Sequence, residues 1–157
     1  MRIEVLRPTK ALMEGAMHTI RTDDLAEWYA GTGSCDIPSL LSYTYGGDCY
    51  AKVAVLDGAP LMAFGVDSLG SGPGSVGSVW LFASDQAEKH KLSLHRALLP
   101  YLEEMQGNHF MLSALSDARN AKHHRWLEWL GFTFAEDTFA GPFGLPFKLY
   151  IRETPCA

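Results

Sequence analysis

Hydrophobic residues recur along this chain with two different spacings, and the changes between them divide it into strands and helices. Alternating or continuous apolar stretches predict β-strands, because successive side chains of a strand point to opposite faces of its sheet. The strands are expected at residues 3–7, 50–56, 59–67, 78–84, 109–115, 132–137 and 146–152. The segment 78–84 (SVWLFAS) is apolar on both faces, which is typical of a strand in the middle of a sheet.

Apolar residues three or four positions apart predict the helices, because residues at this spacing share one helical face. The helices are expected at residues 10–19, 25–30, 34–41 and 85–105 and within 118–132. Side chains that accept hydrogen bonds from free backbone N–H groups favour helix starts. The candidate caps are Thr22, Asp23 and Asp24 for the second helix, Asp85 for the fourth, and Ser116, Asp117 or Asn120 for the last.

Glycine and proline residues predict where these elements turn, end or bend. Asp57-Gly58 is typical of a two-residue hairpin, and the glycine-rich segment 69–78 predicts a longer hairpin loop. Gly131 is expected directly after the last helix, where a left-handed residue commonly ends a helix. Pro100 lies inside the predicted fourth helix, where its ring clashes with the carbonyl of Arg96 at a cost of about 3 kcal/mol. We therefore expect that helix to be kinked or broken in two.

The order of the predicted elements is β-α-α-β-β-β-α-β-α-β-β. It indicates a single α/β domain over residues 1–157, of α+β type, with a central mixed sheet of six or seven strands. Helices are expected on both faces of the sheet. The strand–helix–strand unit at 78–115 should be a parallel, right-handed crossover.

Composition places the chain among globular proteins, with 47% hydrophobic and 20% charged residues. No apolar run approaches the roughly 18–20 residues that span a bilayer, and the first ten residues lack the order of a signal peptide. Cys35, Cys49 and Cys156 have no metal-ligand spacing and indicate free thiols in a reducing compartment. We expect a cytoplasmic protein that does not enter the membrane.

The charge is unevenly distributed over the sequence. The net charge of −5 argues against binding to nucleic acid or to an anionic membrane. Much of the positive charge nevertheless falls in the segments 89–91, 95–96 and 119–125. This basic island suits a compact anionic ligand better than a long polyanion. Two solvated helix faces remain the alternative explanation.

Several catalytic motifs are missing from the sequence. The six histidines and three cysteines form no HxxxH, CxxC or HExxH pattern, so no metal site is predicted. There is no G-x-S-x-G or Walker A sequence, which argues against a serine hydrolase or a P-loop NTPase. The glycines of 70–77 precede a strand instead of opening a helix, so they form no dinucleotide-binding fingerprint.

The late stretch ARNAKHHRWLEWLGF (118–132) carries the clearest resemblance to a known family. Asn120, followed by Leu127-Glu128-Trp129-Leu130-Gly131-Phe132, resembles the late helix of the GNAT fold of acyl-CoA-dependent N-acyltransferases. That helix commonly has Asn, a Tyr seven residues later, and then Glu-Lys-Leu-Gly-Phe. The order of the elements resembles the family over most of the chain. The resemblance implies a GNAT-like fold and an N-acetyltransferase that moves an acyl group to an amine acceptor.

The resemblance also implies where acetyl-CoA or another acyl-CoA would bind as co-substrate. The backbone of Leu81, Phe82 and Ala83 would pair with its pantetheine arm, and residues 89–94 would hold its pyrophosphate. The latter residues are Lys89, His90, Lys91, Leu92, Ser93 and Leu94. The family's pattern of Arg/Gln-x-x-Gly-x-Gly/Ala lets phosphates approach a helix start closely, and this segment has no glycine. Either the side chains of residues 89–91 hold the phosphates, or no cofactor binds.

The catalytic residues depart from the family as well. The family's Tyr often protonates the leaving thiolate, and its counterpart here is Leu127, which has no proton to give. His123 or His124, about one helical turn earlier, could substitute, or both could be structural. Asn120 would order the substrate end of the cleft, and an ordered water or His124 would deprotonate the amine. Leu127 and Leu130 should face the core, with Trp126 or Trp129 half-exposed.

A second resemblance involves the stretch W-x-x-x-S-D-Q from Trp80 to Gln86. Together with the basic helix after it and the helix ending near Gly131, it is similar to phage proteins related to internal virion protein A of T7-like phages. This implies a phage or prophage gene and phage structural proteins as partners. The alternative to an enzyme is then a non-catalytic virion or assembly protein on a GNAT scaffold. A module that senses acyl-CoA without turnover is a third possible function. The chain could also form a homodimer.

Overall fold

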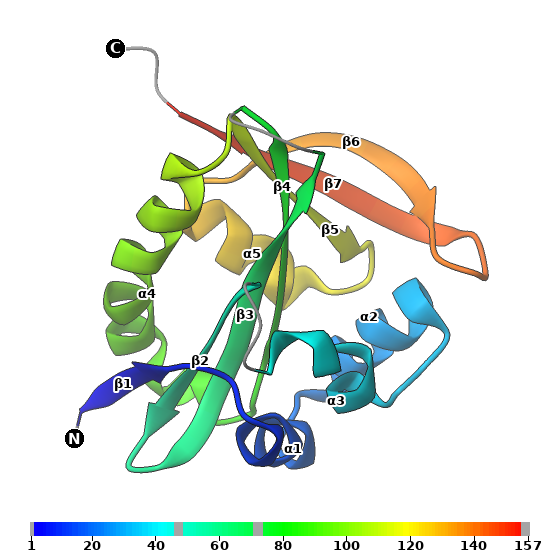
Figure 1. Ribbon diagram of the computed structural model, residues 1–157. Helices are drawn as coiled ribbons and strands as arrows, with labels where there is room; N and C mark the ends of the chain where they lie inside the picture. Colours follow the sequence, from blue (N-terminus) through cyan, green and yellow to red (C-terminus); the bar gives the residue numbers. More distant parts are fainter. Residues whose placement is uncertain (1, 46–48, 71–73, 155–157) are drawn as a thin grey trace.

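The centre of the molecule is a mixed, seven-stranded sheet (Figure 1). The computed structural model describes residues 2–45, 49–70 and 74–154. The strands are β1 (Ile3–Leu6), β2 (Tyr50–Leu56), β3 (Ala59–Leu69), β4 (Val76–Ala83), β5 (Met111–Asp117), β6 (Thr133–Ala140) and β7 (Leu145–Glu153). They lie in the order β1-β2-β3-β4-β5-β7-β6, in which only β4 and β5 pair in parallel. The predicted mixed sheet, with the apolar strand at its centre, is confirmed.

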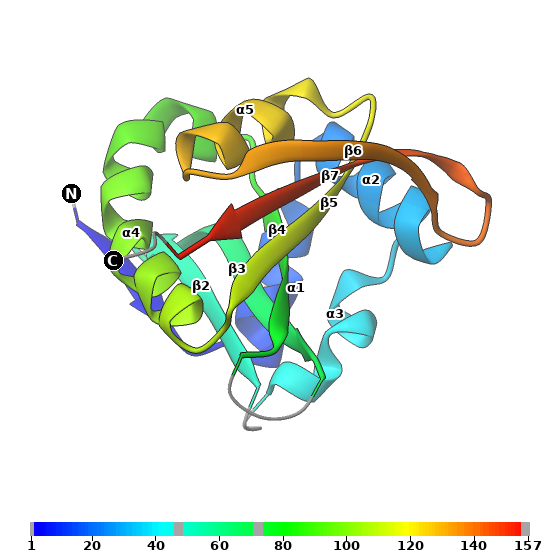
Figure 2. The ribbon, with the colours of Figure 1, turned by 90° about the horizontal axis from the view of Figure 1, so that it is seen from above.

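Helices cover both faces of this sheet (Figures 1 and 2). They are α1 (Lys10–His18), α2 (Thr22–Thr32), α3 (Ile37–Leu40), α4 (Lys91–Gly107) and α5 (Ala121–Trp129), with short 3₁₀ helices η1 (Ser42–Thr44) and η2 (Ala87–His90). One core packs α4 and α5 against the sheet, and a second packs α1 and α3 against its other side. Neighbouring β4 residues divide between them, since Leu81 lies in the first core and Phe82 in the second. The alternation of a strand thus supplies both layers.

Local signals explain most of the turns. Asp57 and Gly58 have φ angles of 50° and 83°, and they join β2 to β3 as the predicted two-residue hairpin. Asn120 is the N-cap of α5, where its side chain accepts a hydrogen bond from the N–H of His123 at 3.3 Å. Gly131 follows α5 with a φ of 92°, and the N–H of Phe132 reaches back to the carbonyl of Leu127. The glycine-rich loop is described only outside residues 71–73.

The prediction for the fourth helix is wrong about its start, and one of the two alternatives for Pro100, a broken helix, is excluded. Asp85 does not cap it, because η2 intervenes and α4 begins at Lys91 with His90 as its N-cap. Pro100 does not break it either, because α4 continues through this residue to Gly107. Pro100 is exposed on the outer side of α4, while Leu98 and Leu102 on its inner side are buried. Burial of that apolar stripe holds the helix together despite the proline.

The start of the second helix also differs from the prediction. Thr22 and Asp23 are not caps but the first residues of α2, and the N-cap position falls on Arg21. Asp24 lies inside the helix and is 1% exposed. A cap would lie at the surface end of the helix, so this carboxylate must have partners elsewhere in the fold.

The parallel strands β4 and β5 separate soon after they meet. They pair only at Val76–Met111, Gly77–Leu112 and Ser78–Ser113. The remaining residues of β4, up to Ala83, and of β5, up to Asp117, diverge, and Figure 2 shows the two strands pointing apart. A gap therefore opens in the middle of the sheet, bordered by α2 on one side and α5 on the other. Both helices supply side chains to it.

Candidate functional site

Asp24 of α2 fills part of the gap between the diverging strands. Its carboxylate accepts a hydrogen bond from the backbone N–H of Ala83 at 2.8 Å and from Nδ2 of Asn120 at 3.0 Å. It also accepts two hydrogen bonds from Nη2 of the buried Arg21 at 2.9 Å each. Nη1 of Arg21 in turn lies 3.1 Å from Glu88 in η2. One buried ion pair thus links α2, the end of β4 and the start of α5.

The backbone of β4 that faces the gap already has partners. Besides the contact with Asp24, the carbonyl of Ala83 accepts from the N–H of Arg21 at 2.9 Å. The carbonyl of Leu81 accepts from Nε1 of Trp28 at 3.4 Å. Phe82 points its side chain into the core on the α1 side. The three residues predicted to hold a pantetheine arm lie beside the gap, but α2 occupies several of their polar groups.

Glu27, one turn further along α2, reaches across to β5 and α5. Its Oε1 atom accepts from Oγ of Ser116 at 2.7 Å and from the N–H of Asp117 at 2.6 Å. Its Oε2 atom lies 2.9 Å from Nδ1 of His123. Ser116, Asp117 and His123 are all buried. The sequence did not single out Glu27 and indicated Asp24 only as a helix cap, although the i, i+3, i+4 pattern of Asp24, Glu27 and Trp28 puts them on one helical face.

His123 is a buried base with a carboxylate partner. Burial alone lowers the pKa of its imidazole, but the negative charge and hydrogen bond of Glu27, assisted by Asp24, outweigh this effect, so the pKa is raised. Its Nδ1 atom is engaged by Glu27 and Ser116. The other ring nitrogen, Nε2, is buried and has no hydrogen-bond partner among the described residues. A buried N–H without a partner is costly, which marks Nε2 as a position for a ligand or a water.

A cavity of about 250 Å³ lies at the point where the strands diverge. Glu27, Trp28, Trp80 and His123 are among the residues of its wall. The other lining residues are Gly31, Thr32, Ser78, Val79, Leu81, Leu115, Ala140, Gly141 and Phe147. Trp28 and Trp80 meet edge to face at 6.2 Å between ring centroids. The cavity therefore combines an aromatic wall with one carboxylate–imidazole pair.

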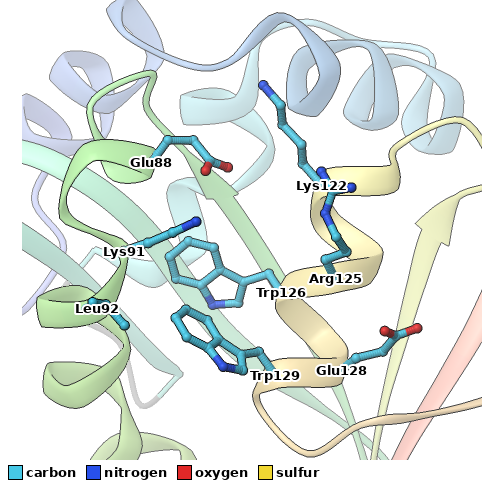
Figure 3. A pocket seen from close by; sticks show the side chains of 8 residues that line it. All are labelled: Glu88, Lys91, Leu92, Lys122, Arg125, Trp126, Glu128 and Trp129. Atoms are coloured by element: carbon cyan, nitrogen blue, oxygen red, sulfur yellow. The ribbon is translucent and has the colours of Figure 1, made fainter.

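A larger groove of about 660 Å³ lies between the start of α4 and the outer face of α5 (Figure 3). Three cations, Lys91, Lys122 and Arg125, line it together with the carboxylates Glu88 and Glu128. Leu92, Trp126 and Trp129 supply its apolar wall. None of the three cations forms an ion pair with another residue in the described part of the chain. The predicted basic island is real in three dimensions, although its segments are about thirty residues apart in the sequence.

The predicted phosphate segment 89–94 contributes only partly to this groove. Lys91 and Leu92 line it, and Leu92 is 59% exposed at its rim and so does not close it. Lys89, His90 and Ser93 are not among the lining residues of this groove. The side chain of Leu94 is fully buried in the core, so only its backbone could meet a ligand. Sequence reasoning underrated the contribution of α5, whose side chains form the opposite wall.

The two tryptophans of α5 differ in exposure. Trp126 is 5% exposed, and its Nε1 atom is buried without a hydrogen-bond partner among the described residues. Trp129 is 44% exposed and stacks on His95 of α4 at 4.6 Å between ring centroids. Leu127 and Leu130 are buried as predicted. Trp126 thus places an unpaired N–H donor in the wall of the groove.

Asn120 and His124, the predicted catalytic residues, have defined partners of their own. Asn120 caps α5 and donates to Asp24, so it joins the helix to the buried ion pair. His124 uses Nε2 to donate to the carbonyl of Asp117 at 2.9 Å, and its ring stacks on Tyr150. Burial is the main reason why the pKa of His124 is lowered. Of the two neighbouring histidines, His123 is the one that lines the aromatic cavity.

Within residues 2–45, 49–70 and 74–154, no group of three His, Cys, Asp or Glu side chains could hold a metal ion. None of the helices in this part of the chain is long and apolar enough to cross a membrane. Cys35 and Cys49 are free and exposed, and Cys156 lies outside the described residues.

No model of a known protein family and no curated protein matches the sequence. Solved structures do match it. The aminoglycoside N(6')acetyltransferase of Legionella pneumophila is 12% identical, with a TM-score of 0.74, over 97% of this chain and 92% of that chain. An acetyltransferase of the GNAT family from Streptococcus pneumoniae is also 12% identical, with a TM-score of 0.66, over 98% and 100% of the two chains.

A third structure shows this fold with a ligand. The protein yncA of Salmonella typhimurium, described as a proposed acetyltransferase with its cofactor acetyl-CoA, is 14% identical, with a TM-score of 0.72. The match covers 100% of this chain and 97% of that chain. At such identities the likeness concerns architecture alone, and that architecture confirms the predicted fold class. The chain has the mixed-sheet fold of the GNAT acetyltransferases.

Proposed function

We propose that this protein is an N-acyltransferase that moves the acyl group of acetyl-CoA, or of another acyl-CoA, to a small amine. The observation that carries the proposal is the separation of β4 from β5 after three paired positions. The aromatic cavity lies in the resulting gap, and the cationic groove lies along the helix that borders it. Lys122 and His123 are successive residues of α5 and line the groove and the cavity, respectively. An acyl-CoA could thus bind through its phosphates in the groove, while its thioester reacts in the cavity.

The phosphates of the co-substrate would lie in the groove. Lys91, Lys122 and Arg125 face it without ion-pair partners among the described residues, so their charge is free for an anion (Figure 3). Glu88 lies 3.1 Å from Arg21, which offsets part of its charge, although Arg21 is also paired with Asp24. The α4 helix starts beside the groove, and its N-cap His90 makes no capping hydrogen bond through its side chain. In this site, cationic side chains replace the backbone contacts that glycines permit.

The acceptor would occupy the aromatic cavity. Its volume of about 250 Å³ suits a small molecule, and Trp28, Trp80 and Phe147 favour an apolar or aromatic body. The reacting nitrogen would lie toward Glu27 and His123, which are the ionisable groups in this wall. Asn120, through its bond to Asp24, keeps α2 and α5 at the distance that this cavity requires. Its role is therefore to position the site.

The occupied backbone of β4 favours a second function. Asp24 and Trp28 already pair with Ala83 and Leu81, so an acyl-CoA arm could bind along this strand only if α2 moved. A phage or prophage assembly protein that kept the GNAT scaffold without its chemistry would not need free backbone N–H and carbonyl groups on β4. Phe139 and Phe143, which are 75% and 51% exposed near the β6–β7 turn, could then contact a structural partner. Both functions fit a protein of the bacterial cytoplasm.

Thermal and calorimetric binding measurements with acetyl-CoA test the first proposal. A ligand at 100 times its Kd stabilises a folded protein by about 2.7 kcal/mol. The double variant Lys122→Glu/Arg125→Glu should lose this stabilisation. The matched control Arg2→Glu/Arg7→Glu makes the same change in charge at exposed residues that flank β1 and are not among the lining residues of the groove, and it should retain the stabilisation.

Release of free CoA in the presence of 2-phenylethylamine and hexylamine distinguishes the functions. Binding together with amine-dependent CoA release supports the transferase. Binding without release points to a module that senses acyl-CoA. If the protein neither binds acetyl-CoA nor releases CoA, only the assembly function remains.

A further inference from the structure

His123 is held in a way that leaves one reactive atom free. Glu27 and Ser116 lie 2.9 Å from its Nδ1 atom, so the ring cannot rotate without breaking both contacts. Nε2, at the opposite edge of the ring, has no partner among the described residues. His123 lines the cavity in the gap between β4 and β5. The imidazole is thus fixed through Nδ1, while Nε2 is the buried ring nitrogen that has no partner among the described residues.

We propose that His123, held by Glu27, carries the proton from the attacking amine to the leaving sulfur during acyl transfer. This inference rests on the function proposed above and names the group that performs its proton transfer. Acyl transfer from a thioester releases one proton at nitrogen and requires one at sulfur. A single group that faces both atoms and is replenished in each turnover can perform both steps.

The reaction conserves both protons and electron pairs. The neutral amine attacks the thioester carbon, its lone pair forms the C–N bond, and the carbonyl electrons move onto oxygen. When the carbonyl re-forms, the C–S bond breaks and the electron pair leaves on sulfur, which takes the Nε2 proton of His123 as a thiol. The neutral imidazole then accepts the surplus proton from the nitrogen. The products are the amide and free CoA, and His123 returns to its protonated form.

Neighbouring charges shift the ring of His123 toward the protonated form that this step needs. Glu27 and Asp24 of α2 favour the protonated imidazole, whereas burial and the cation of Arg21 oppose it. From β5, Ser116 contacts the ring, and Asp117 is already paired with Arg119 at 2.7 Å. The balance raises the pKa of His123 above that of a free imidazole, although this wall of the cavity is otherwise mostly apolar.

The neighbouring histidine does not meet the same requirements. Nε2 of His124 donates to the carbonyl of Asp117, and its ring is stacked on Tyr150. The main effect on its pKa is burial, which lowers it. Leu127, one turn after His123, is fully buried and apolar. On this helix, the geometry therefore favours His123 over His124 for proton transfer.

The test measures CoA release from acetyl-CoA with 2-phenylethylamine or hexylamine between pH 6 and 9. His123→Asn is the main variant, because its side-chain amide can take the place of Nδ1 beside Glu27 while Nε2 is lost. We expect kcat to fall by about 10²- to 10⁴-fold, the range typical of a lost acid–base group. The Kd for acetyl-CoA should remain unchanged in calorimetry. His18→Gln, an exposed histidine at the end of α1, is the matched control and should keep full activity.

A second variant separates proton transfer from a structural role. His123→Ala leaves a space for free imidazole, which should restore part of the rate in proportion to its concentration. Full activity of His123→Asn, or a loss that follows His124→Gln instead, overturns the inference and leaves the transferase standing. A loss without rescue, accompanied by a lower Tm in both His123 variants, shows a structural residue and overturns it too. If the wild-type protein releases no CoA with either amine, the proposed function fails, and this inference fails with it.

Discussion

The Nδ1 atom of His123 lies 2.9 Å from the Oε2 atom of Glu27, although 96 residues separate them in the sequence. Both side chains are almost fully buried, and they join α2 to α5 across the gap between β4 and β5. Removing one partner of a buried pair leaves the other without compensation, which commonly costs more than the pair itself contributes. The pair therefore couples the stability of the fold to the charge of the candidate site.

Glu27→Gln should destabilise the protein in a pH-dependent way. The pKa of His123 is raised in the folded protein above its unfolded value of about 6.5. Its protonation therefore contributes stability that is fully present below about pH 6.5 and is lost as pH rises through the folded pKa. The free energy of unfolding should be about 3 kcal/mol lower than in the wild type at pH 6, and the difference should shrink toward pH 9.

Urea unfolding at several pH values measures this difference. Glu4→Gln, at an exposed position of β1, is the control and should change the free energy of unfolding by about 0.5 kcal/mol or less at every pH. A difference between Glu27→Gln and the wild type that is constant with pH would mean that His123 is neutral in the folded protein.

Asp24→Asn should be among the most destabilising single substitutions in α2. Asp24 neutralises the buried Arg21 and accepts the N–H of Ala83, and an amide can replace only part of this. We expect a loss of about 3 kcal/mol in the free energy of unfolding. Asp23→Asn makes the same change at the exposed neighbouring position and should cost about 0.5 kcal/mol. Equal effects in the two variants would show that Arg21 is compensated by Glu88 alone.

The fold was largely predictable because its signals are local. The alternation of β2 gave its bounds of 50–56, and Asp57-Gly58 specified the hairpin to β3 through its backbone preferences. The apolar segment around Leu81 indicated a central strand because both of its faces are covered. The start of α4 was not predictable in the same way. A 3₁₀ turn and an α-helical turn differ little in energy, and the residues around Asp85 fit both.

The candidate site was predictable only where its residues lie on helix faces. The basic segments were expected to suit a compact anionic ligand, with the phosphates assigned to residues 89–91 alone, and the structure brings Lys91 together with Lys122 and Arg125. Asp24 was interpreted as a cap because aspartate is common at helix starts, whereas its partners are Ala83 and Asn120, far along the chain. Pattern and composition carry no information on such long-range pairs.

Gly141→Ala should damage both stability and the aromatic cavity. Gly141 has a φ of 76°, and a Cβ atom there would collide with the carbonyl oxygen of Ala30. The substitution would therefore push the β6–β7 turn away from α2, at a cost of more than about 2 kcal/mol. Gly144→Ala is the matched control, since its φ is 62° and no atom lies within 4 Å of the added Cβ. It should cost about 1 kcal/mol from backbone strain alone.

Thermal melts of the two alanine variants, with circular dichroism to confirm folding, measure this contrast. Because Gly141 lines the cavity and Gly144 is not among its lining residues, only the first should also weaken amine-dependent CoA release. Equal losses in both variants would mean that the turn can shift without cost and that α2 does not rest against it.

Pro100→Ala should make the protein more stable. Pro100 is exposed within α4, so the substitution removes no buried contact, and it restores a backbone N–H that can bond within the helix. Proline in a helix interior is about 3 kcal/mol less favourable than alanine. The unfolded alanine variant has more conformational freedom, which lowers the gain in stability by about 1 kcal/mol. The free energy of unfolding should therefore rise by about 2 kcal/mol in urea titrations.

Ser93→Ala, also exposed in α4, is the control for helix propensity and should add only about 0.5 kcal/mol. A Pro100→Ala variant no more stable than the wild type would mean that the proline has no net cost in α4, with the carbonyl of Arg96 satisfied by another donor.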